Sequence, residues 1–423
     1  MKTDVLIVGS GLAGLIAGLG LDSSLDVLMI CNDKKEKSDS SLAQGGISTL
    51  LHKFDYESYL QDTLKAGRFE NDIEVVKTMI DNSNDLILDL IKYGVEFDFD
   101  YTREGGHSAK RILHHQDVTG KEITTKLLIE LEQRKNITLF EQTAMLDLII
   151  VDNVCLGAII LKDGIITPVY AGQVILATGG IGGLFKQSTN YTHIKGDSFA
   201  IAIKNNIELD HLDYIQIHPT LLYSKDKGRN FLISESIRGE GAVIVDKDGN
   251  QFVDSLLPRD IVAKAIKDKM VEQNTDHVYL DVSNIPYEKM IEHFPNIYQT
   301  CLERGIDPYK DRIPIMPGQH YLMGGIKASV KGQTSIRNLY AIGETAGTGV
   351  HGKNRLASNS LLESGVFAKL CAKHINENKQ DPREIGVDLS PYENISEYQE
   401  ANRKTVLDYL KNKNKEFYNE WLL

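Results

Sequence analysis

The first thirty residues constrain the fold more than any other part of the chain. An apolar run at 5–8 is followed by GSGLAG at 9–14, by helix-compatible Leu15, Ala17 and Leu19, and by a second apolar run at 26–30. Strand, glycine turn, helix and strand in this order form a βαβ unit. The opening therefore predicts a doubly wound α/β domain that binds a dinucleotide.

The glycine turn has the spacing GxGxxG, and each glycine has a separate use. Gly9 permits a tight turn, Gly11 lets the backbone approach a pyrophosphate, and Gly14 lets the helix pack against the strand. The helix N-terminus also favours a phosphate group. We expect the dinucleotide to contact Gly9, Ser10, Gly11, Leu12, Ala13 and Gly14.

The acidic residue that often follows the second strand and binds ribose is missing. Cys31 and Asn32 occupy that region, so we expect Asn32 or the backbone to make the ribose contact. This part of the sequence does not distinguish FAD from NAD.

Length and charge limit the class of protein. A chain of 423 residues is too long for one compact core, so two or three domains are expected. The net charge of −12 disfavours nucleic acid and anionic membrane as partners. No apolar run is long enough to cross a membrane, and no signal-like segment precedes the first strand. We expect a soluble, cytoplasmic protein.

The four cysteines favour the same location. Cys31, Cys155, Cys301 and Cys371 are far apart and form no CxxC pair. This is typical of buried thiols in a reducing compartment, rather than of disulfides or a zinc site.

Strand and turn patterns recur along the chain. LDLIIV and GAIIL predict a hairpin, the apolar spacing at 73–93 is helical, and QVILATGGIGG at 173–183 is a strand before a glycine turn. Residues 213–322 mix short strands and helices, with KDGN at 247–250 as a hairpin turn. NLYAIGETAG at 338–347 is again a strand followed by a glycine turn, as in the N-terminal region. We predict a discontinuous dinucleotide domain (1–212 and 323–385), an inserted α+β domain (213–322) and a short helical tail (386–423).

One stretch concentrates reactive side chains. TREGGHSAKRILHHQDVTG, at 102–120, contains Glu104, His107, Arg111, His114 and His115. Alone it is compatible with metal binding, phosphate binding or proton transfer. No second cluster of histidine, cysteine or carboxylate residues with ligand spacing occurs in the sequence, so we predict no metal site.

Later motifs point to a family. The chain carries, in order, AQGGI, ATGG, GD, HPT, ESIRGEGA, PRDIVAKAI, HYLMGGI and NRLASNSLLESG. This is the order found in the succinate dehydrogenase and fumarate reductase flavoproteins, which the chain resembles from residue 4 to about 372. The resemblance implies a Rossmann-like FAD-binding domain, an inserted capping domain, and a dicarboxylate bound between them. It adds to the expected FAD contacts Ser40, Ser41, Ala43, Gln44, Gly45, Gly46, Asp197, Glu344, Ser360 and Leu361.

Within that family, the stretch at 102–120 is similar to that of the L-aspartate oxidases, in which a glutamate replaces a non-acidic residue of the fumarate reductases. A carboxylate at Glu104 suits an α-ammonium group, the feature that separates aspartate from succinate, and it repels a plain dicarboxylate. His107 is expected near the flavin. Arg111, His114 and His115 are expected to be structural.

A four-carbon diacid needs cationic or hydrogen-bonding groups that survive desolvation, and the fork of arginine is the best of these. The resemblance assigns the carboxylates to His218, His320 and Arg355, and makes Arg259 the proton-transfer arginine of the family. Arginine has a pKa above about 12, so electrostatic positioning is the main contribution that we expect of it. The expected catalytic set also contains Glu104, Gln216, Ser234 and Glu235.

The implied reaction is FAD-dependent oxidation of L-aspartate to iminoaspartate. Hydride would pass from the substrate Cα to the flavin, and the electrons would leave to oxygen or fumarate. In the family this product feeds quinolinate synthase and NAD biosynthesis.

Three departures from the family pattern bear on these expectations. SDSSLAQGG lacks the histidine that links FAD in membrane-bound succinate dehydrogenases, so we expect a non-covalent cofactor. The span from QFVDS to LLPRD is shorter than is usual, and the chain stops at residue 423 without the longer C-terminal helical domain of the family.

Three other functions remain open from the sequence. A soluble fumarate reductase is the first, and Glu104 argues against it. An electron-transfer subunit of a membrane complex is the second, and a flavin-binding protein without turnover is the third. Neither the working oxidant nor the oligomeric state follows from residue types.

Overall fold

The computed structural model describes residues 1–98 and 100–422, and it begins with the predicted βαβ unit. Strand β1 (Lys2–Val8), helix α1 (Leu12–Gly20) and strand β2 (Val27–Ile30) follow in the expected order. The two strands are parallel, with Val5 opposite Val27. Gly9 has a φ of 118°, a conformation that favours glycine, and it starts the turn into α1.

β1 lies within a seven-stranded sheet. The strand order is β5–β2–β1–β8–β7–β6, with β17 also paired to β8. The strands β5 (Ile137–Phe140), β8 (Ile165–Leu176) and β17 (Leu339–Ala341) are parallel to their neighbours β2, β1 and β8. Residues 339–341 thus return to the sheet that the N-terminus begins.

The predicted hairpin is confirmed, and a third strand extends it. β6 (Thr143–Val151) and β7 (Val154–Lys162) are antiparallel, and β7 is antiparallel to the first half of β8. Asp152 and Asn153 have positive φ values of 50° and 61°, and Asp163 and Gly164 have values of 51° and 77°. Two consecutive positive φ values are those of the type I′ turn, whose twist matches that of the flanking strands.

Alternate side chains of β1 face two different cores. Val5 and Ile7 belong to the core under α1, whereas Leu6 and Val8 belong to the core on the opposite face of the sheet. This alternation is the two-residue period of a strand that is buried on both faces.

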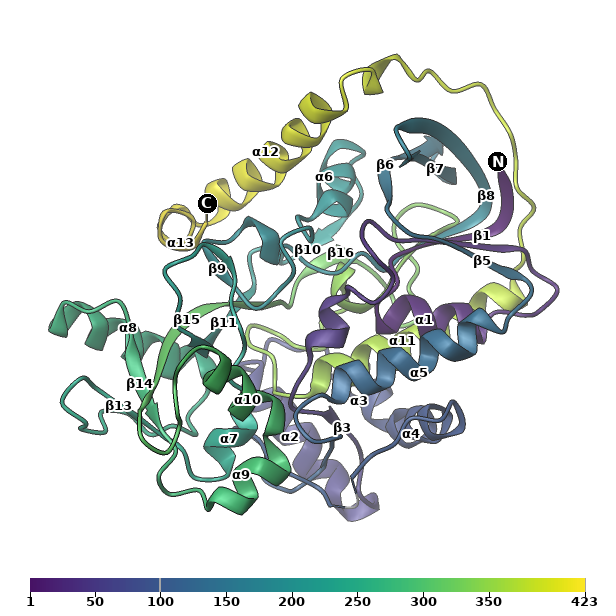
Figure 1. Ribbon diagram of the computed structural model, residues 1–423. Coiled ribbons are helices and arrows are strands. Elements are labelled where there is room, and N and C mark those ends of the chain that lie inside the picture. Colours follow the sequence, from purple (N-terminus) through teal and green to yellow (C-terminus); the bar gives the residue numbers. More distant parts are fainter. Residues whose placement is uncertain (99, 423) are drawn as a thin grey trace.

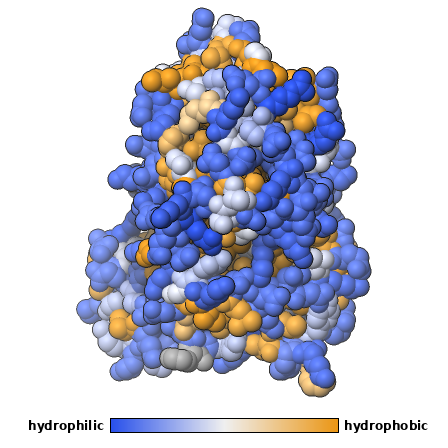
Figure 2. Space-filling view, turned by 90° about the vertical axis from the view of Figure 1, so that its right-hand side faces the viewer, coloured by the Kyte–Doolittle hydropathy of each residue, from blue (hydrophilic) through white to orange (hydrophobic). Residues whose placement is uncertain are grey.

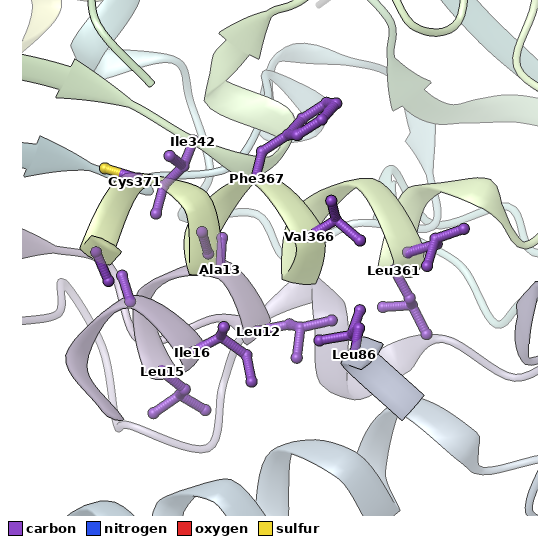
Figure 3. Packing of buried hydrophobic residues seen from close by; sticks show 14 of the residues in the cluster. Leu12, Ala13, Leu15, Ile16, Leu86, Ile342, Leu361, Val366, Phe367 and Cys371 are labelled. Atoms are coloured by element: carbon purple, nitrogen blue, oxygen red, sulfur yellow. The ribbon is translucent and has the colours of Figure 1, made fainter. Parts of the chain in front are cut away.

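Three helices run together on the first face of the sheet (Figure 1): α1, α5 (Thr119–Glu132) and α11 (Asn359–Glu377). Figure 3 shows α11 lying across α1, with Leu361 and Val366 on the side that faces Leu12. This packing holds the N-terminus of α1 beside the loop that leads into α11.

Helices α2 (Tyr56–Ala66), α3 (Ile73–Asp81) and α4 (Ser83–Lys92) extend the same layer. The helical pattern at 73–93 is therefore two helices, and the break is local. Asn82 Nδ2 donates to Thr78 O at 2.8 Å, and Ser83 Oγ donates to Ile80 O at 2.7 Å. These side chains satisfy the last carbonyl groups of α3, so the helix ends there.

A second sheet, with its own hydrophobic core, forms the inserted region. Its order is β12–β9–β15–β14–β13, with β11 paired to β15. The strands are β9 (Gln187–Ser188), β11 (Ile215–Leu222), β12 (Gly228–Arg229), β13 (Val243–Val245), β14 (Val278–Asp281) and β15 (Ile313–Leu322). The helices are α7 (Glu235–Gly239), α8 (Arg259–Gln273), α9 (Tyr287–His293) and α10 (Pro295–Glu303). Because β9 precedes residue 213, the sheet extends beyond the predicted insertion.

The turn predicted at 247–250 is present, but it does not join two long strands. Gly249 has a φ of 88°, and Asp246 N donates to Asn250 O at 3.0 Å. An isolated bridge between Val245 and Gln251 closes the turn, and β13 pairs with β14 instead.

Short elements complete the chain. Strands β3 (Ile47–Ser48) and β4 (Ile112–Leu113) pair with each other, and β16 (Gly325–Lys327) pairs with β10 (Leu209–Asp210) and β18 (Ala346–Gly347). The 3₁₀ turns are η1 (Asp39–Leu42), η2 (Lys53–Asp55), η3 (Gly182–Leu184), η4 (Gly343–Thr345) and η5 (Ser390–Tyr392).

The predicted C-terminal tail is largely helical and packs against the second face of the sheet. Helix α12 (Ile395–Lys413) runs beside α6 (Asp197–Lys204), and α13 (Lys415–Trp421) follows it (Figure 1). Val406 and Leu410 of α12 enter the core of that face, and Leu423 lies outside the described residues.

The surface and the cysteines agree with the composition. On the face in Figure 2, hydrophilic residues predominate and hydrophobic ones form separate patches. Within residues 1–98 and 100–422, no helix is long and apolar enough to cross a membrane. All four cysteines are buried and carry free thiols, as predicted.

The glycine turn gives a test of the packing. A Cβ at position 14 would overlap the carbonyl oxygen of Gly9, which cannot move without disturbing β1. Gly14→Ala should lower the free energy of unfolding by about 2 kcal/mol or more. Gly386→Ala is the control, because a Cβ there meets no atom within 4 Å. Urea unfolding followed by circular dichroism measures both, and equal stabilities would contradict the packing.

Candidate active site

A cavity of about 380 Å³ extends from the first glycine turn to the helices of the inserted region. Gly9 lies at one end, and Arg259 and His320 lie at the other. It opens beside the carboxyl ends of β1 and β8, which is where open α/β sheets bind ligands.

Most residues predicted to contact the dinucleotide line this cavity. Leu12 is buried in the hydrophobic core instead, and Gly14 packs against the carbonyl of Gly9. The lining residues of the predicted set are Gly9, Ser10, Gly11, Ala13, Asn32, Ser40, Ser41, Ala43, Gln44, Gly45, Gly46, Asp197, Glu344, Ser360 and Leu361.

The polar groups of this wall fit the phosphate and hydroxyl groups of FAD. Gly11 precedes α1 and lines the cavity, so the N-terminus of the helix lies at this wall; its first N–H group, that of Leu12, donates to Ser40 Oγ at 3.1 Å. Among the described residues, Ser38 Oγ and Gln44 Oε1 are buried and make no hydrogen bond within the chain. Buried polar atoms normally have partners, so these atoms are suited to a polar ligand.

Two partly buried carboxyl groups face the same wall. Glu344 Oε1 accepts a hydrogen bond from Leu322 N at 2.9 Å, and burial raises the pKa of Glu344 to about 8. Asp39 Oδ1 accepts from Tyr191 N at 2.8 Å, and burial raises the pKa of Asp39 to about 7. A carboxyl group with a raised pKa can donate as well as accept, which suits the hydroxyl groups of a ribityl chain. Glu344 was predicted here; Asp39 was missed, since its sequence context does not reveal burial.

The opposite end of the cavity carries four groups suited to carboxylates: His218, Arg259, His320 and Arg355. They come from β11, α8, β15 and the loop before α11, so the fold brings together residues far apart in sequence. The rings of His218 and His320 lie with their centroids 5.0 Å apart.

Both histidines are held in the neutral form. Burial, followed by the charges of Arg259 and Arg355, places the pKa of each imidazole well below its usual value. His218 Nδ1 accepts from Thr220 N at 3.2 Å, so the ring proton lies on Nε2. Nε2 has no hydrogen-bond partner in the described chain and is available as a donor to a ligand.

Arg259 is fixed from two sides. Its Nε donates to Glu235 Oε2 at 2.6 Å, and its NH1 donates to Gln216 Oε1 at 3.0 Å. Gln216 Oε1 also accepts from Arg355 Nε at 3.3 Å. Gln216 therefore lies behind the two arginines and joins them, rather than lining the cavity as its grouping with the catalytic residues suggested.

Arg238 was missed by the sequence reasoning. It is fully buried, its NH1 donates to Ser255 O, and its NH2 lies 3.6 Å from Glu235 Oε2. The spacing of Glu235 and Arg238, three residues apart on one helix, is a signal that could have identified the pair. Glu235 is thus shared by two guanidinium groups, whose charges hold its pKa below the usual value despite burial.

Arg355 is buried among polar, aromatic and charged side chains. Its NH1 donates to Ser360 Oγ at 2.6 Å, and its guanidinium group lies 4.5 Å from the ring centre of Tyr321. Burial, together with the charge of Arg259, lowers its pKa to about 10. Arg355 therefore remains a cation at neutral pH.

Glu104 lines the cavity at the same end as these groups and is 4% exposed. Its Oε1 accepts from Ser236 Oγ at 2.9 Å, and its Oε2 accepts from Ser358 Oγ at 2.5 Å. Within the described part of the chain, Glu104 takes part in no salt bridge, in contrast to Glu235, which pairs with Arg259. Ser234 also lines the cavity and caps α7 through its hydroxyl group.

The rest of the 102–120 stretch supports this wall. Arg111 is fully buried and forms salt bridges with Asp55 at 2.8 Å and Asp62 at 2.6 Å. It also donates to His107 Nδ1 at 3.0 Å, and His107 Nε2 contacts Ala357 O at 2.9 Å. Burial lowers the pKa of His107 to about 4, so this ring is neutral.

The other histidines of the stretch lie away from the main cavity. His114 Nδ1 lies 3.1 Å from Asp98, and the weaker contact of His115 with Asp98 is 4.0 Å. Among residues 1–98 and 100–422, no group of three or more histidine, cysteine or carboxylate side chains is arranged to hold a metal ion.

Several lining residues were not among the predicted contacts. Asp33 and Arg229 belong to no motif, whereas Ser38 and Asp39 lie within SDSSLAQGG and Tyr321 within HYLMGGI.

Comparison with known proteins gives one family. Residues 4–361 match the family described as FAD binding domain. The chain is 49% identical to the L-aspartate oxidase of Clostridium perfringens, over 96% of this chain and 93% of that protein. It is 46% identical to the L-aspartate oxidase of Clostridium acetobutylicum (89% and 89%), and 41% identical to that of Nostoc (92% and 72%).

Solved structures show the same architecture. The chain resembles E. coli quinol fumarate reductase with a TM-score of 0.84 and 27% identity, over 96% of this chain and 74% of that one. A flavocytochrome c3 fumarate reductase in an open conformation gives a TM-score of 0.69 at 25% identity, over 89% and 78%.

The raised pKa of Glu344 predicts a dependence of stability on pH. In an unfolded chain this carboxyl group titrates near about 4.3, whereas in the folded chain its pKa is about 8. The folded chain therefore keeps a proton that the unfolded chain loses, and the stabilisation present below about pH 4.3 is lost as the pH rises to about 8.

Glu344→Gln should therefore reduce the fall in free energy of unfolding of the ligand-free protein between pH 6 and pH 8.5, by about 1 to 3 kcal/mol. Urea unfolding at both pH values measures it, with Glu393→Gln, at an exposed position, as the control. A Glu344→Gln variant with the wild-type pH dependence would contradict the raised pKa of Glu344.

Proposed function

The chain belongs to the FAD binding domain family, and from that premise we propose that it is an FAD-dependent L-aspartate oxidase, which converts L-aspartate to iminoaspartate. One observation carries the choice of substrate. A single cavity combines four carboxylate-binding groups with Glu104, a buried carboxylate that is held by neutral hydroxyl groups.

FAD, when bound, supplies the two-electron acceptor for the hydride that leaves the substrate Cα. We assign its binding to the first glycine turn, to residues 38–46 and to Glu344, which line one end of the cavity. Residues 38–46 contain no histidine, which supports a non-covalent cofactor.

We assign the two carboxylates of the substrate to His218, His320, Arg259 and Arg355. The guanidinium groups offer paired N–H donors, and the neutral imidazole of His218 offers Nε2–H. These contacts are strengthened by burial, because water does not screen them inside the cavity.

Glu104 is assigned to the α-ammonium group. A carboxylate without a short ion pair attracts an ammonium group strongly in a buried cavity, and it repels a further carboxylate. Glu235 cannot serve in this way, because Arg259 and Arg238 already balance its charge.

Arg259 is assigned a positioning and electrostatic role. Two of its nitrogen atoms are engaged by Glu235 and Gln216, so the guanidinium plane is fixed before the substrate arrives. Preorganised donors of this kind stabilise charge in a transition state without further rearrangement.

We further propose that electrons leave to oxygen or fumarate. The four carboxylate-binding groups would accept fumarate as well as aspartate, which supports fumarate as one acceptor. The product would then pass to quinolinate synthase for NAD biosynthesis. We place the protein in the cytoplasm, because free buried thiols suit a reducing compartment.

Fumarate reduction is the second candidate for the main activity, because the same four groups bind an unsubstituted diacid. Glu104 distinguishes the two, since succinate and fumarate present no ammonium group to it.

We propose the domain division 1–212 with 323–385 for FAD, 213–322 for the cap and 386–423 for the tail. The separate hydrophobic core of the inserted region supports it, and the pairing of β9 with β15 indicates that a short part of the first segment joins the cap.

Glu104→Gln tests the substrate. Removing the charge should lower kcat/KM for L-aspartate oxidation by about 100-fold or more, because the amide no longer attracts the ammonium group. Fumarate reduction by the dithionite-reduced enzyme should change by less than about threefold. Equal losses in both reactions would contradict the assignment of Glu104.

Arg259→Lys should behave differently. Lysine cannot hold Glu235, Gln216 and a carboxylate at once, so both reactions should slow by about 100-fold or more. Arg403→Lys, on α12, is the control and should leave both rates unchanged. Loss of one reaction alone would show that Arg259 does not bind a group common to both substrates.

A further inference from the structure

Two buried glutamates lie at the same end of the cavity, and they have different partners. Glu235 accepts from Arg259 Nε at 2.6 Å and lies near Arg238, so its charge is balanced by cations. Glu104 accepts from two neutral hydroxyl groups, those of Ser236 and Ser358. The hydroxyl groups orient the carboxylate of Glu104 without neutralising it.

The hydroxyl group of Ser236 can point in one direction only. Ser236 N donates to Ser234 Oγ at 3.3 Å, and Ser234 Oγ donates to Ser236 Oγ at 3.2 Å. Ser236 Oγ therefore accepts from Ser234 and donates its single proton to Glu104 Oε1, at 2.9 Å. This chain of hydroxyl groups is anchored at the start of α7.

Ser358 adopts a backbone conformation that is uncommon for a residue with a side chain. Its φ is 61°, and its carbonyl oxygen accepts from Ser48 N at 3.2 Å and from Ser48 Oγ at 3.1 Å. In this conformation its own Oγ reaches Glu104 Oε2 at 2.5 Å. Strained backbone that surrounding contacts maintain is concentrated at functional sites.

The charge of Glu104 has competing partners nearby. Burial lowers the pKa of Arg238 and of Arg355, and the charge of Glu104 partly opposes that effect, although the hydrogen bonds of both arginines go elsewhere. A pair between Glu104 and Arg355 is the competing arrangement, because their charges attract each other. That pairing would neutralise Glu104 and remove a group that binds the substrate carboxylate.

We infer that Ser236 and Ser358 are positioning residues that set the preference for a diacid carrying an ammonium group over an unsubstituted diacid. They occupy one acceptor site on each oxygen of Glu104, keep it away from Arg355, and leave its remaining lone pairs for the ammonium N–H groups. This inference rests on the proposed function.

The test uses the FAD-loaded enzyme and the ratio of two rates, kcat/KM for L-aspartate oxidation and kcat/KM for fumarate reduction. Ser236→Ala removes one hydroxyl group from a helix that tolerates alanine. Ser358→Gly removes the other, and glycine suits a φ of 61°. Each variant should lower the ratio by about tenfold or more, with fumarate reduction changed by less than about threefold.

Three measurements separate positioning from a structural role. Ser236→Thr keeps the hydroxyl group and should restore most of the ratio. In a Glu104→Gln background, Ser236→Ala should have no further effect on the ratio, because there is no charge left to position. Ser83→Ala, which removes a buried serine hydroxyl group at the start of α4, is the matched control and should leave the ratio unchanged.

Suppose that Glu104→Gln lowers the ratio as proposed. Variants of Ser236 and Ser358 that slow both reactions equally, or that leave both rates unchanged, would then overturn the inference. If Glu104→Gln itself leaves the ratio unchanged, the proposed function fails, and the inference fails with it.

Discussion

Glu235 holds the cationic end of the cavity together. Arg259 is the first residue of α8, where the helix dipole disfavours a cation, and Arg238 is fully buried three residues after Glu235. One carboxylate, at the first position of α7, compensates both guanidinium groups. Breaking such a buried pair leaves an uncompensated charge, so the carboxylate-binding geometry depends on it.

The remaining site is arranged around that charge balance. Gln216 joins Arg259 to Arg355. His218 and His320 lie beside the arginines and are neutral, because burial and the arginine charges make a further positive charge there costly. Glu104, held by hydroxyl groups, then provides a negative charge at the same end of the cavity. The cavity is therefore complementary to a molecule with two carboxylates and one ammonium group.

Much of this arrangement could be predicted from sequence, for identifiable reasons. The βαβ unit and the β6–β7 hairpin follow from short-range patterns. The ordered motifs pointed to His218, Arg259, His320 and Arg355, and the 102–120 stretch pointed to Glu104; the fold brings all five to one cavity. Side-chain environments could not be predicted in the same way. Gln216 belongs to a predicted motif, but its place behind the arginines depends on packing between distant segments.

Other differences have local causes. The division between α3 and α4 comes from side chains at Asn82 and Ser83 that bind the last carbonyl groups of a helix, which a hydrophobic period does not report. The raised pKa of Asp39 comes from burial. That burial arises only when the chain folds, so the residues next to Asp39 in the sequence do not reveal it.

The measurement that tests the central claim most directly is anaerobic stopped-flow mixing of the yellow, FAD-loaded protein with L-aspartate, and separately with succinate, while the absorbance of the oxidised flavin is followed. The account predicts rapid bleaching by L-aspartate and none by succinate, because only aspartate carries the ammonium group that we propose Glu104 binds. Bleaching by succinate, or no bleaching by aspartate in a protein whose reduced form is reoxidised by fumarate, would contradict it.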